Sequence, residues 1–273
     1  MEKLRKSVIA GSWYPVNPST LRNDINRYLQ NVPDRAIKGD IIGLIVPHAG
    51  YIYSGQVAAH AYKLVFGKKY DTVILVGPSH RVAFHGVSIY SEGGYETPLG
   101  VVPVNEKIAE EMKRLSKTIV DLPAAHDQEH SLEIQLPFLQ VALGSFSFVP
   151  LVMGDQNDAT CRELAAVIYR VAQDRRVLIV ASTDLSHFYD YNKASQLDGI
   201  ALGSIQDGDA EALLKNLTQD KTEACGGGPM VAMMLALKKL GVHHSLLLKY
   251  ANSGDVTGDK RSVVGYASAV FYR

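Results

Sequence analysis

Short, nearly continuous apolar runs alternate with longer segments of helical periodicity along the whole chain. Such apolar runs are typical of strands that are buried on both faces of a sheet. The four clearest runs are residues 41–47, 71–78, 146–154 and 176–182. The helical patterns between and around them cover residues 19–30, 54–66, 105–116, 130–142, 158–173, 193–216 and 229–240. This alternation predicts an α/β fold, with a single domain over residues 1–273 and a central, mostly parallel sheet flanked by helices.

Two further segments extend this predicted sheet. Residues 86–104 combine apolar alternation with several glycines, which predicts an appended hairpin. The final stretch, SVVGYASAVFYR, is typical of a closing strand.

Polar side chains follow three of the predicted strands at once. His48 lies in PHAGYIYSG after the first strand, His80 lies in GPSH after the second, and Asp184 and His187 lie in STDLSH after the fourth. Adjacent parallel strands deliver their carboxyl-end loops to one edge of a sheet, where ligands bind in open α/β folds. The sequence therefore predicts that these side chains converge on one site.

Two histidines and one anionic side chain form a metal site with open positions, which suits non-haem iron or zinc. Asp184 and Cys225 are both available as the third ligand. In TEACGGGPM, Pro229 suits the first turn of a helix, so Cys225 would lie just before the helix N-terminus. The helix dipole would then lower the thiol pKa. A small buried cysteine before a turn and a glycine loop that binds phosphate are the alternatives, although the segment lacks the lysine of a P-loop.

The segment HDQEHSLE supports a competing hypothesis. His126, Glu129 and His130 match the H-x-x-E-H pattern of inverted zincins, which requires one continuous helix. The preceding DLPAA has the composition of a turn, so we expect a helix N-terminus at which His126 and Glu129 contribute to a substrate pocket. Glu133 shares the helical face of Glu129, where a solvated acidic surface is the alternative.

Composition limits the classes of partner. The 273 residues are 47% apolar, and 28 basic residues balance 28 acidic ones, so no bulk charge favours nucleic acid or an anionic membrane. The apolar runs are too short to span a bilayer, which predicts a cytoplasmic protein. Two cysteines do not form a disulfide framework. A small molecule or a peptide is the expected ligand, and a homo-oligomer is an open alternative.

Six motifs in this order carry a family resemblance: GSWYP, VPHAGYIYSG, VGPSH, EHSLEIQLPFL, STDLSH and CGGGP. The chain resembles the MEMO family, including the prokaryotic members called AmmeMemoRadiSam system protein B. That family is similar to the class III extradiol dioxygenases, so the resemblance implies their α/β fold and a metal pocket. It further implies metal ligation by His48, His80 and Cys225, with Asp184 and His187 beside them and Trp13 and Tyr53 in the pocket.

The resemblance also implies a chemistry. In the related dioxygenases a glutamate is the third ligand of Fe(II), which binds both oxygens of a catechol while a nearby histidine moves a proton. His187 would take that acid/base role, with Asp184 beside it. Cys225 replaces the carboxylate, and its softer thiolate suits copper, zinc or a differently tuned iron. The expected function is an iron or copper oxidoreductase acting on a small molecule; the alternative is a non-catalytic adaptor that binds metal or peptide in the same pocket.

Overall fold

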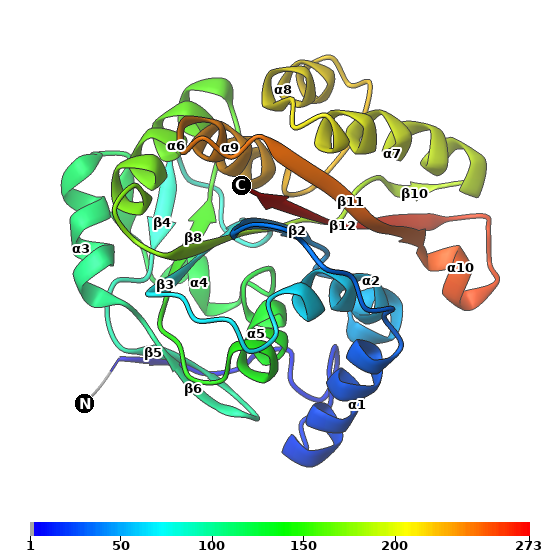
Figure 1. Ribbon diagram of the computed structural model, residues 1–273, viewed down its shortest axis with the longest axis horizontal. Helices are drawn as coiled ribbons and strands as arrows, with labels where there is room; N and C mark the ends of the chain where they lie inside the picture. Colours follow the sequence, from blue (N-terminus) through cyan, green and yellow to red (C-terminus); the bar gives the residue numbers. More distant parts are fainter. Residues whose placement is uncertain (1–2) are drawn as a thin grey trace.

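The computed structural model describes residues 3–273, and four parallel strands form the centre of its main sheet (Figure 1). In spatial order these strands are β2 (Ile41–Val46), β9 (Val177–Ser182), β3 (Thr72–Pro78) and β8 (Phe148–Met153). Their side chains are buried almost throughout, as expected for strands covered on both faces. All four predicted strands are thus confirmed.

The margins of this sheet are largely antiparallel. β12 (Val263–Tyr272) pairs antiparallel with β2, and β11 (His244–Asn252) and β10 (His187–Tyr189) both pair antiparallel with β12. At the opposite margin β4 (Val87–Ile89) pairs antiparallel with β8 and parallel with β7 (Ile119–Asp121). The α/β class is confirmed, and the sheet is mixed with a parallel centre.

The predicted hairpin is divided between two sheets. Its first part is β4 of the main sheet, whereas β5 (Gly94–Thr97) and β6 (Gly100–Pro103) form a tight antiparallel pair elsewhere. β1 (Leu4–Arg5) adds to β5 in parallel, which makes a separate three-stranded sheet. The hairpin is therefore shorter than residues 86–104 and anchors the N-terminal segment.

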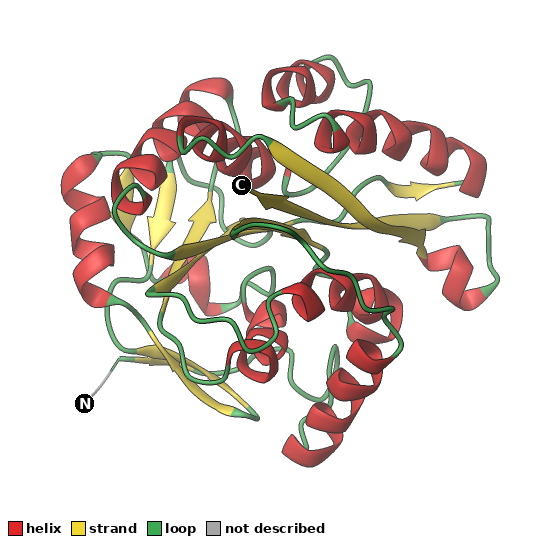
Figure 2. Cartoon of the chain, in the orientation of Figure 1, coloured by secondary structure: helices red, strands yellow, loops and turns green. Residues whose placement is uncertain are grey.

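Helices cover both faces of the main sheet (Figures 1 and 2). α1 (Pro18–Gln30), α2 (Tyr51–Leu64) and α5 (Leu136–Leu143) contact one another on one face. α6 (Asp158–Ala172) packs against α9 (Gly227–Lys239) on the other face, and α3 (Glu106–Leu115) packs against α6. A short α10 (Ser253–Thr257) lies between β11 and β12 in the chain.

Two predicted helices are interrupted. Residues 193–216 form α7 (Tyr191–Gln206) and α8 (Ala210–Thr218), because the turn between them contains Gly208 at a φ of 64°. Residues 130–142 are helical only from a 3₁₀ turn (Glu133–Gln135) onward, while α4 (Ala124–Asp127) is a separate short helix. The H-x-x-E-H pattern therefore does not lie on one helix.

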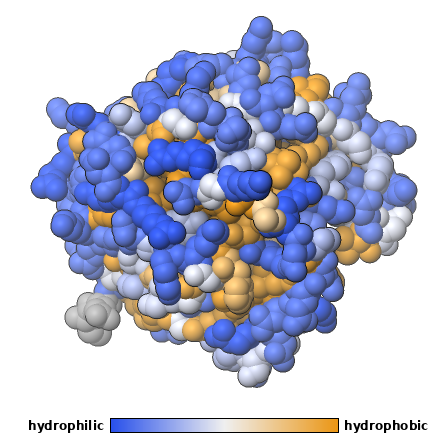
Figure 3. All heavy atoms as spheres, viewed as in Figure 1, coloured by the Kyte–Doolittle hydropathy of each residue, from blue (hydrophilic) through white to orange (hydrophobic). Residues whose placement is uncertain are grey.

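The buried apolar side chains form one continuous core between the sheet and its helices. On the face shown in Figure 3, polar residues dominate the outline and apolar residues reach the surface between them. Within residues 3–273, every helix is too short or too polar to cross a bilayer.

Candidate metal centre

The loops at the carboxyl ends of the central parallel strands meet at one point. β9 lies between β2 and β3, so the loops that follow these three strands are neighbours. His48, His80 and Asp184 each stand two residues beyond the end of their strand. The His48 N–H donates to Asp184 Oδ1 at 2.7 Å, which ties two of these loops together.

Cys225 joins the two histidines at this point. One ligand atom from each of His48, His80 and Cys225 lies within 4.8 Å of the others. His48 Nε2 is 3.0 Å from Cys225 Sγ, and the two imidazole rings stand perpendicular with centroids 5.1 Å apart. Asp184 is outside this compact group, although its N–H lies 3.2 Å from the sulfur. Of the two candidate third ligands, Cys225 is thus the one beside both histidines.

Hydrogen bonds to the Nδ1 atoms orient both imidazoles. The Ser182 hydroxyl donates its one proton to the Ser131 carbonyl at 2.6 Å, so it accepts from His48 Nδ1 at 3.1 Å. His80 Nδ1 lies 2.9 Å from Glu129 Oε1. An Nδ1–H held by an acceptor fixes the tautomer that leaves Nε2 as a metal ligand. The donor set therefore fits a metal ion.

Glu129 serves as an orienting carboxylate. His80, Glu129 and His130 form a second compact group, but the Glu129 oxygens also accept the N–H groups of His80 (2.6 Å), His130 (2.9 Å) and Ser131 (2.8 Å). Burial disfavours the charged carboxylate, and the contacts with His80 outweigh it, so the pKa of Glu129 falls to about 2. Glu129 lies behind His80 and does not line the cavity where the sequence analysis expected it to bind substrate.

His126 does not reach the candidate centre. Its Nδ1 is 2.6 Å from the Tyr95 hydroxyl and its Nε2 is 2.9 Å from the Ser88 hydroxyl, inside the protein core. Burial and the charge of Arg5 lower the His126 pKa to about 3. Both ring nitrogens are occupied, so the inverted-zincin hypothesis is wrong, and the expected role of His126 in substrate binding is not supported by its position.

Glu133 is a structural residue. It is fully buried and forms an ion pair with Arg5, while it also accepts hydrogen bonds from Ser7 Oγ (2.6 Å) and Tyr14 OH (2.7 Å). The alternative of a solvated acidic surface is wrong for this residue. Its contacts fasten the N-terminal segment to the sheet.

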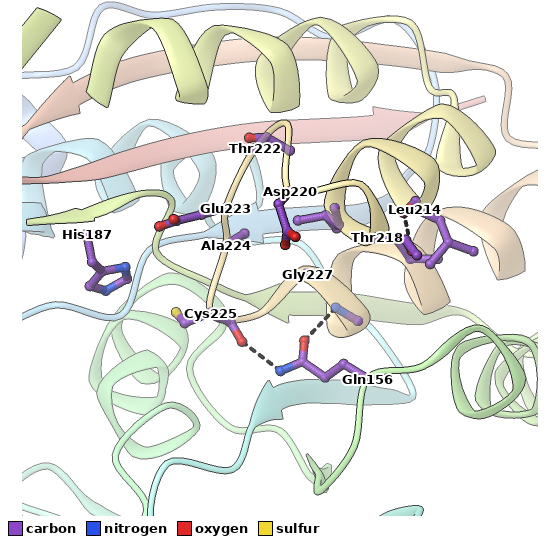
Figure 4. Close-up of a pocket in the computed structure, with 13 residues that line it drawn as sticks. Gln156, His187, Leu214, Thr218, Asp220, Thr222, Glu223, Ala224, Cys225 and Gly227 are labelled. Atoms are coloured by element: carbon purple, nitrogen blue, oxygen red, sulfur yellow. Dashed lines mark hydrogen bonds between the residues drawn. The ribbon is translucent and has the colours of Figure 1, made fainter. Parts of the chain in front are cut away.

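The glycines after Cys225 allow close packing around the thiol. A Cβ on Gly226 would lie 2.3 Å from the Ser182 carbonyl oxygen, and a Cβ on Gly228 would lie 2.7 Å from Gln156 Cβ. Gln156 comes from the loop after β8, and its amide bridges the Cys225 carbonyl (2.8 Å) and the Gly228 N–H (2.6 Å), as Figure 4 shows. The sequence analysis missed Gln156, whose only signal is its position after a fourth parallel strand.

The N-terminus of α9 has no free donors for an anion at the glycines. Gly226 N–H donates to Thr183 Oγ1 at 2.9 Å, Gly227 N–H to the Ala224 carbonyl at 3.2 Å, and Gly228 N–H to Gln156. The phosphate-cradle alternative is therefore wrong. Cys225 does precede the helix as predicted, but burial raises the pKa of its thiol and the Asp184 carboxylate adds to this shift, opposite to the expected direction.

A cavity of about 470 Å³ opens onto the two histidines, and we call it the histidine cavity. Trp13, Tyr53, Asp184 and His187 all line it, as the sequence analysis expected. The remaining residues of its wall are Ser12, His48, Ala49, Gly50, Ile52, His80, His130, Val264 and Tyr266.

His130 is a cavity residue that the sequence analysis did not assign. Its ring stacks on His80 at a centroid distance of 4.4 Å and lies equally close to Trp13. Burial lowers its pKa to about 4. Its signal in the sequence is its position directly after Glu129, the residue that orients His80.

Burial shifts the pKa values of two titratable groups in the cavity, in each case toward favouring the neutral form. Burial raises the pKa of Asp184 to about 7, against the hydrogen bond from the His48 N–H. Burial also lowers the pKa of His187. His187 therefore stays neutral at neutral pH and can accept a proton, and Asp184 titrates in the same range.

A second cavity of about 470 Å³ lies behind the thiol, and we call it the acidic cavity (Figure 4). His187 lines both cavities, while Cys225 lines this one. Asp220 and Glu223 contribute its carboxylates. The candidate centre is thus next to two cavities, one lined by histidines and aromatic residues and one that includes two carboxylates.

Fold and site together define a mixed α/β protein with a His–His–Cys group at the carboxyl ends of its parallel strands. The family of Memo-like proteins matches residues 5–270, and this chain belongs to that family. MEMO1 family proteins from Methanocaldococcus jannaschii and Thermoplasma volcanium are 39% and 35% identical to it, each over 99% of both chains. A third, from Methanobrevibacter smithii, is 37% identical over 98% of this chain and 99% of its own.

A solved structure shares the fold. An uncharacterized protein from Escherichia coli K12 superimposes with a TM-score of 0.56 at 14% identity, over 85% of this chain and 100% of its own. At that identity the likeness concerns the fold alone.

Proposed function

We propose that this protein is a metal-dependent oxidoreductase of extradiol dioxygenase ancestry that acts on a small molecule in the histidine cavity. His48, His80 and Cys225 would hold one ion, with iron(II) or copper favoured and zinc as a further candidate. The observation that carries this proposal is the compact His–His–Cys group whose two Nδ1 atoms are already held by Ser182 and Glu129.

The chemistry of the donor set supports a redox-active ion. Two imidazoles and a thiolate suit copper and iron, and the ion would supply electron-transfer chemistry and an open position for a ligand. Because burial raises the pKa of the Cys225 thiol, the proton must leave when an ion binds. Metal affinity should therefore increase with pH.

The other cavity residues have distinct roles in this proposal. Trp13 and Tyr53 provide aromatic faces on which a planar ring can stack. His187 lines the cavity as a neutral imidazole and would accept a proton from a bound phenol. The Asp184 carboxylate accepts from the His48 N–H, and the Asp184 N–H donates to the Cys225 sulfur, so Asp184 would position two ligands.

Metal content tests the ligand set. The protein is purified without oxygen, loaded separately with iron(II), copper or zinc, and assayed for metal per chain. We expect about one ion per chain in the wild type and a loss of most of it in His80→Ala and Cys225→Ser. His243→Ala, which removes an exposed histidine outside the group, is the matched control. Full metal content in both ligand variants would refute the proposed triad.

Oxygen consumption tests turnover. The iron- and copper-loaded proteins are supplied with catechols and simple phenols, and His187→Ala should abolish consumption while it keeps its metal. The alternative function is a metal- or peptide-binding adaptor without turnover. Retained metal with no oxygen uptake across the panel would favour that adaptor and count against the oxidoreductase.

A further inference from the structure

The acidic cavity has the size and composition of a second ligand site. Its volume of about 470 Å³ lies within the ordinary range for small-molecule pockets. α8 contributes Leu214 and Leu217, and α9 contributes the fully buried Val231, so one part of the wall is apolar. The loop between these helices supplies Asp220 and Glu223 on the other part. The cavity is therefore amphipathic.

The polar part of this wall favours a cation. Figure 4 shows the Glu223 carboxylate extending toward His187 and the Asp220 carboxylate pointing in among the lining residues. Tyr189 OH donates to Glu223 Oε1, which fixes that side chain and leaves Oε2 for another donor. A carboxylate beside an apolar surface binds a charged N–H donor more strongly than a neutral one.

The same wall offers nothing to an anion. The N–H groups of Gly226, Gly227 and Gly228 are all committed to protein acceptors, so the helix N-terminus is closed. Burial lowers the pKa of His187, which leaves it uncharged at neutral pH. The charge within the described lining residues is thus that of the two carboxylates.

We propose that the acidic cavity binds a small organic cation, an ammonium group attached to an apolar body. The ammonium faces the polar part of the wall, which carries the Asp220 and Glu223 carboxylates, and the body packs on Leu214 and Leu217. Because His187 and Cys225 line this cavity, the bound cation lies next to the candidate centre. The inference rests on the cavity and not on the metal proposed above.

Calorimetric titration of the full chain with benzylamine tests this site. Benzylamine carries an ammonium on an apolar ring, and benzyl alcohol is its neutral counterpart. We expect benzylamine to bind and benzyl alcohol to bind on the order of tenfold or more weakly. Glu223→Gln and Asp220→Asn should each weaken benzylamine on the order of tenfold. Asp174→Asn, an exposed acid outside the cavity, should leave its affinity unchanged.

A further variant locates the bound probe. Thr218 is exposed at the cavity wall, so Thr218→Arg places a cation there with little effect on folding and should abolish benzylamine binding. Unchanged binding in Thr218→Arg would place the probe elsewhere, including the histidine cavity, and would overturn the inference. Equal affinity for benzyl alcohol, or no binding of benzylamine, would overturn it as well. The titration is run on chelator-treated protein, so its outcome is separate from the metal assay.

Discussion

Two regions of this molecule carry histidines whose ring nitrogens are used in opposite ways. Beyond the ends of β2 and β3, His48 and His80 each use Nδ1 for an internal hydrogen bond, and each has a ring nitrogen within 4.8 Å of the Cys225 sulfur. In the segment from residue 126 to 133, His126 uses both nitrogens and Glu133 all of its accepting capacity for contacts inside the core. Hydrogen-bond saturation, not histidine spacing, thus separates a candidate ligand from a structural residue.

Glu129 connects these two regions. It belongs to the saturated segment by sequence, and its carboxylate orients His80 of the candidate centre. The comparison therefore predicts two kinds of behaviour: a loss of stability without metal loss for changes at residues 126 and 133, and weaker metal binding for a change at residue 129.

The largest expected effect is on stability, in Glu133→Gln. This change leaves Arg5 as a buried charge without its partner, and removing one member of a buried ion pair costs about 3–5 kcal/mol. Urea unfolding measures the loss, and the metal content of the folded fraction should equal that of the wild type. Asp174→Asn, on the surface, should change stability by less than about 0.5 kcal/mol. If Glu133→Gln lost metal while its stability was unchanged, the structural assignment would be wrong.

His126→Ala should destabilise the protein without affecting metal binding. It leaves a void in the core, removes the partner of the Tyr95 hydroxyl and removes one of the two partners of the Ser88 hydroxyl, which together cost about 2–4 kcal/mol. Unfolding free energy and metal per chain are measured on the same preparation. Comparison with His80→Ala sharpens the contrast, since that variant should lose metal with a smaller loss of stability. Metal loss in His126→Ala would reverse the assignment of the two regions.

The sequence predicted the centre of the fold because buried parallel strands carry a strong local signal. Residues 73–76 are apolar at every position, and the strand Thr72–Pro78 around them begins and ends within a few residues of the predicted bounds. The margins of the sheet were harder to predict. The antiparallel pairing of β4 with β8 and of β12 with β2 depends on the path that the chain takes before each strand, and the local sequence does not specify that path. The split of residues 193–216 followed from the single left-handed turn at Gly208.

The candidate site was predictable to the same extent. His48, His80 and Asp184 follow strands directly, so topology alone brings them together. The roles of Gln156 and His130 were harder to predict, because they depend on contacts across the fold: an amide that bridges Cys225 and Gly228, and a ring stacked on His80. His126 was misassigned because its spacing to Glu129 says nothing of Tyr95, which comes from another sheet.

Glu129→Gln should weaken metal binding by about 10–100-fold, the usual effect of losing a partner that orients a ligand histidine. The amide can no longer hold the His80 imidazole by a charged contact, although its oxygen still accepts one N–H. Metal titration with a competing chelator measures the affinity, and excess metal should restore full occupancy. Glu163→Gln, a change at a carboxylate remote from the centre that accepts from Ser116, is the control. Unchanged affinity in Glu129→Gln would show that His80 needs no orienting carboxylate.

The smallest expected effect is on the pH dependence of stability. Burial and Arg5 lower the His126 pKa from 6.5 to about 3. Between these two pH values, His126 therefore binds a proton in the unfolded chain but not in the folded protein. The contribution of His126 to the free energy of unfolding is thus fully present above about pH 6.5. It falls as the pH drops, with a slope of at most about 1.4 kcal/mol per pH unit. His48, His130 and His187 are shifted in the same direction and add to the slope.

In His126→Ala the unfolding free energy should therefore depend less steeply on pH between pH 5 and pH 6.5, by the equivalent of about one bound proton. Urea unfolding midpoints across that range measure this slope. The decrease should be the same with chelator and with added zinc, because His126 is remote from the ion. An equal slope in wild type and variant would mean that His126 is protonated in the fold. A decrease seen only in the presence of metal would show that the ion affects the protonation of His126.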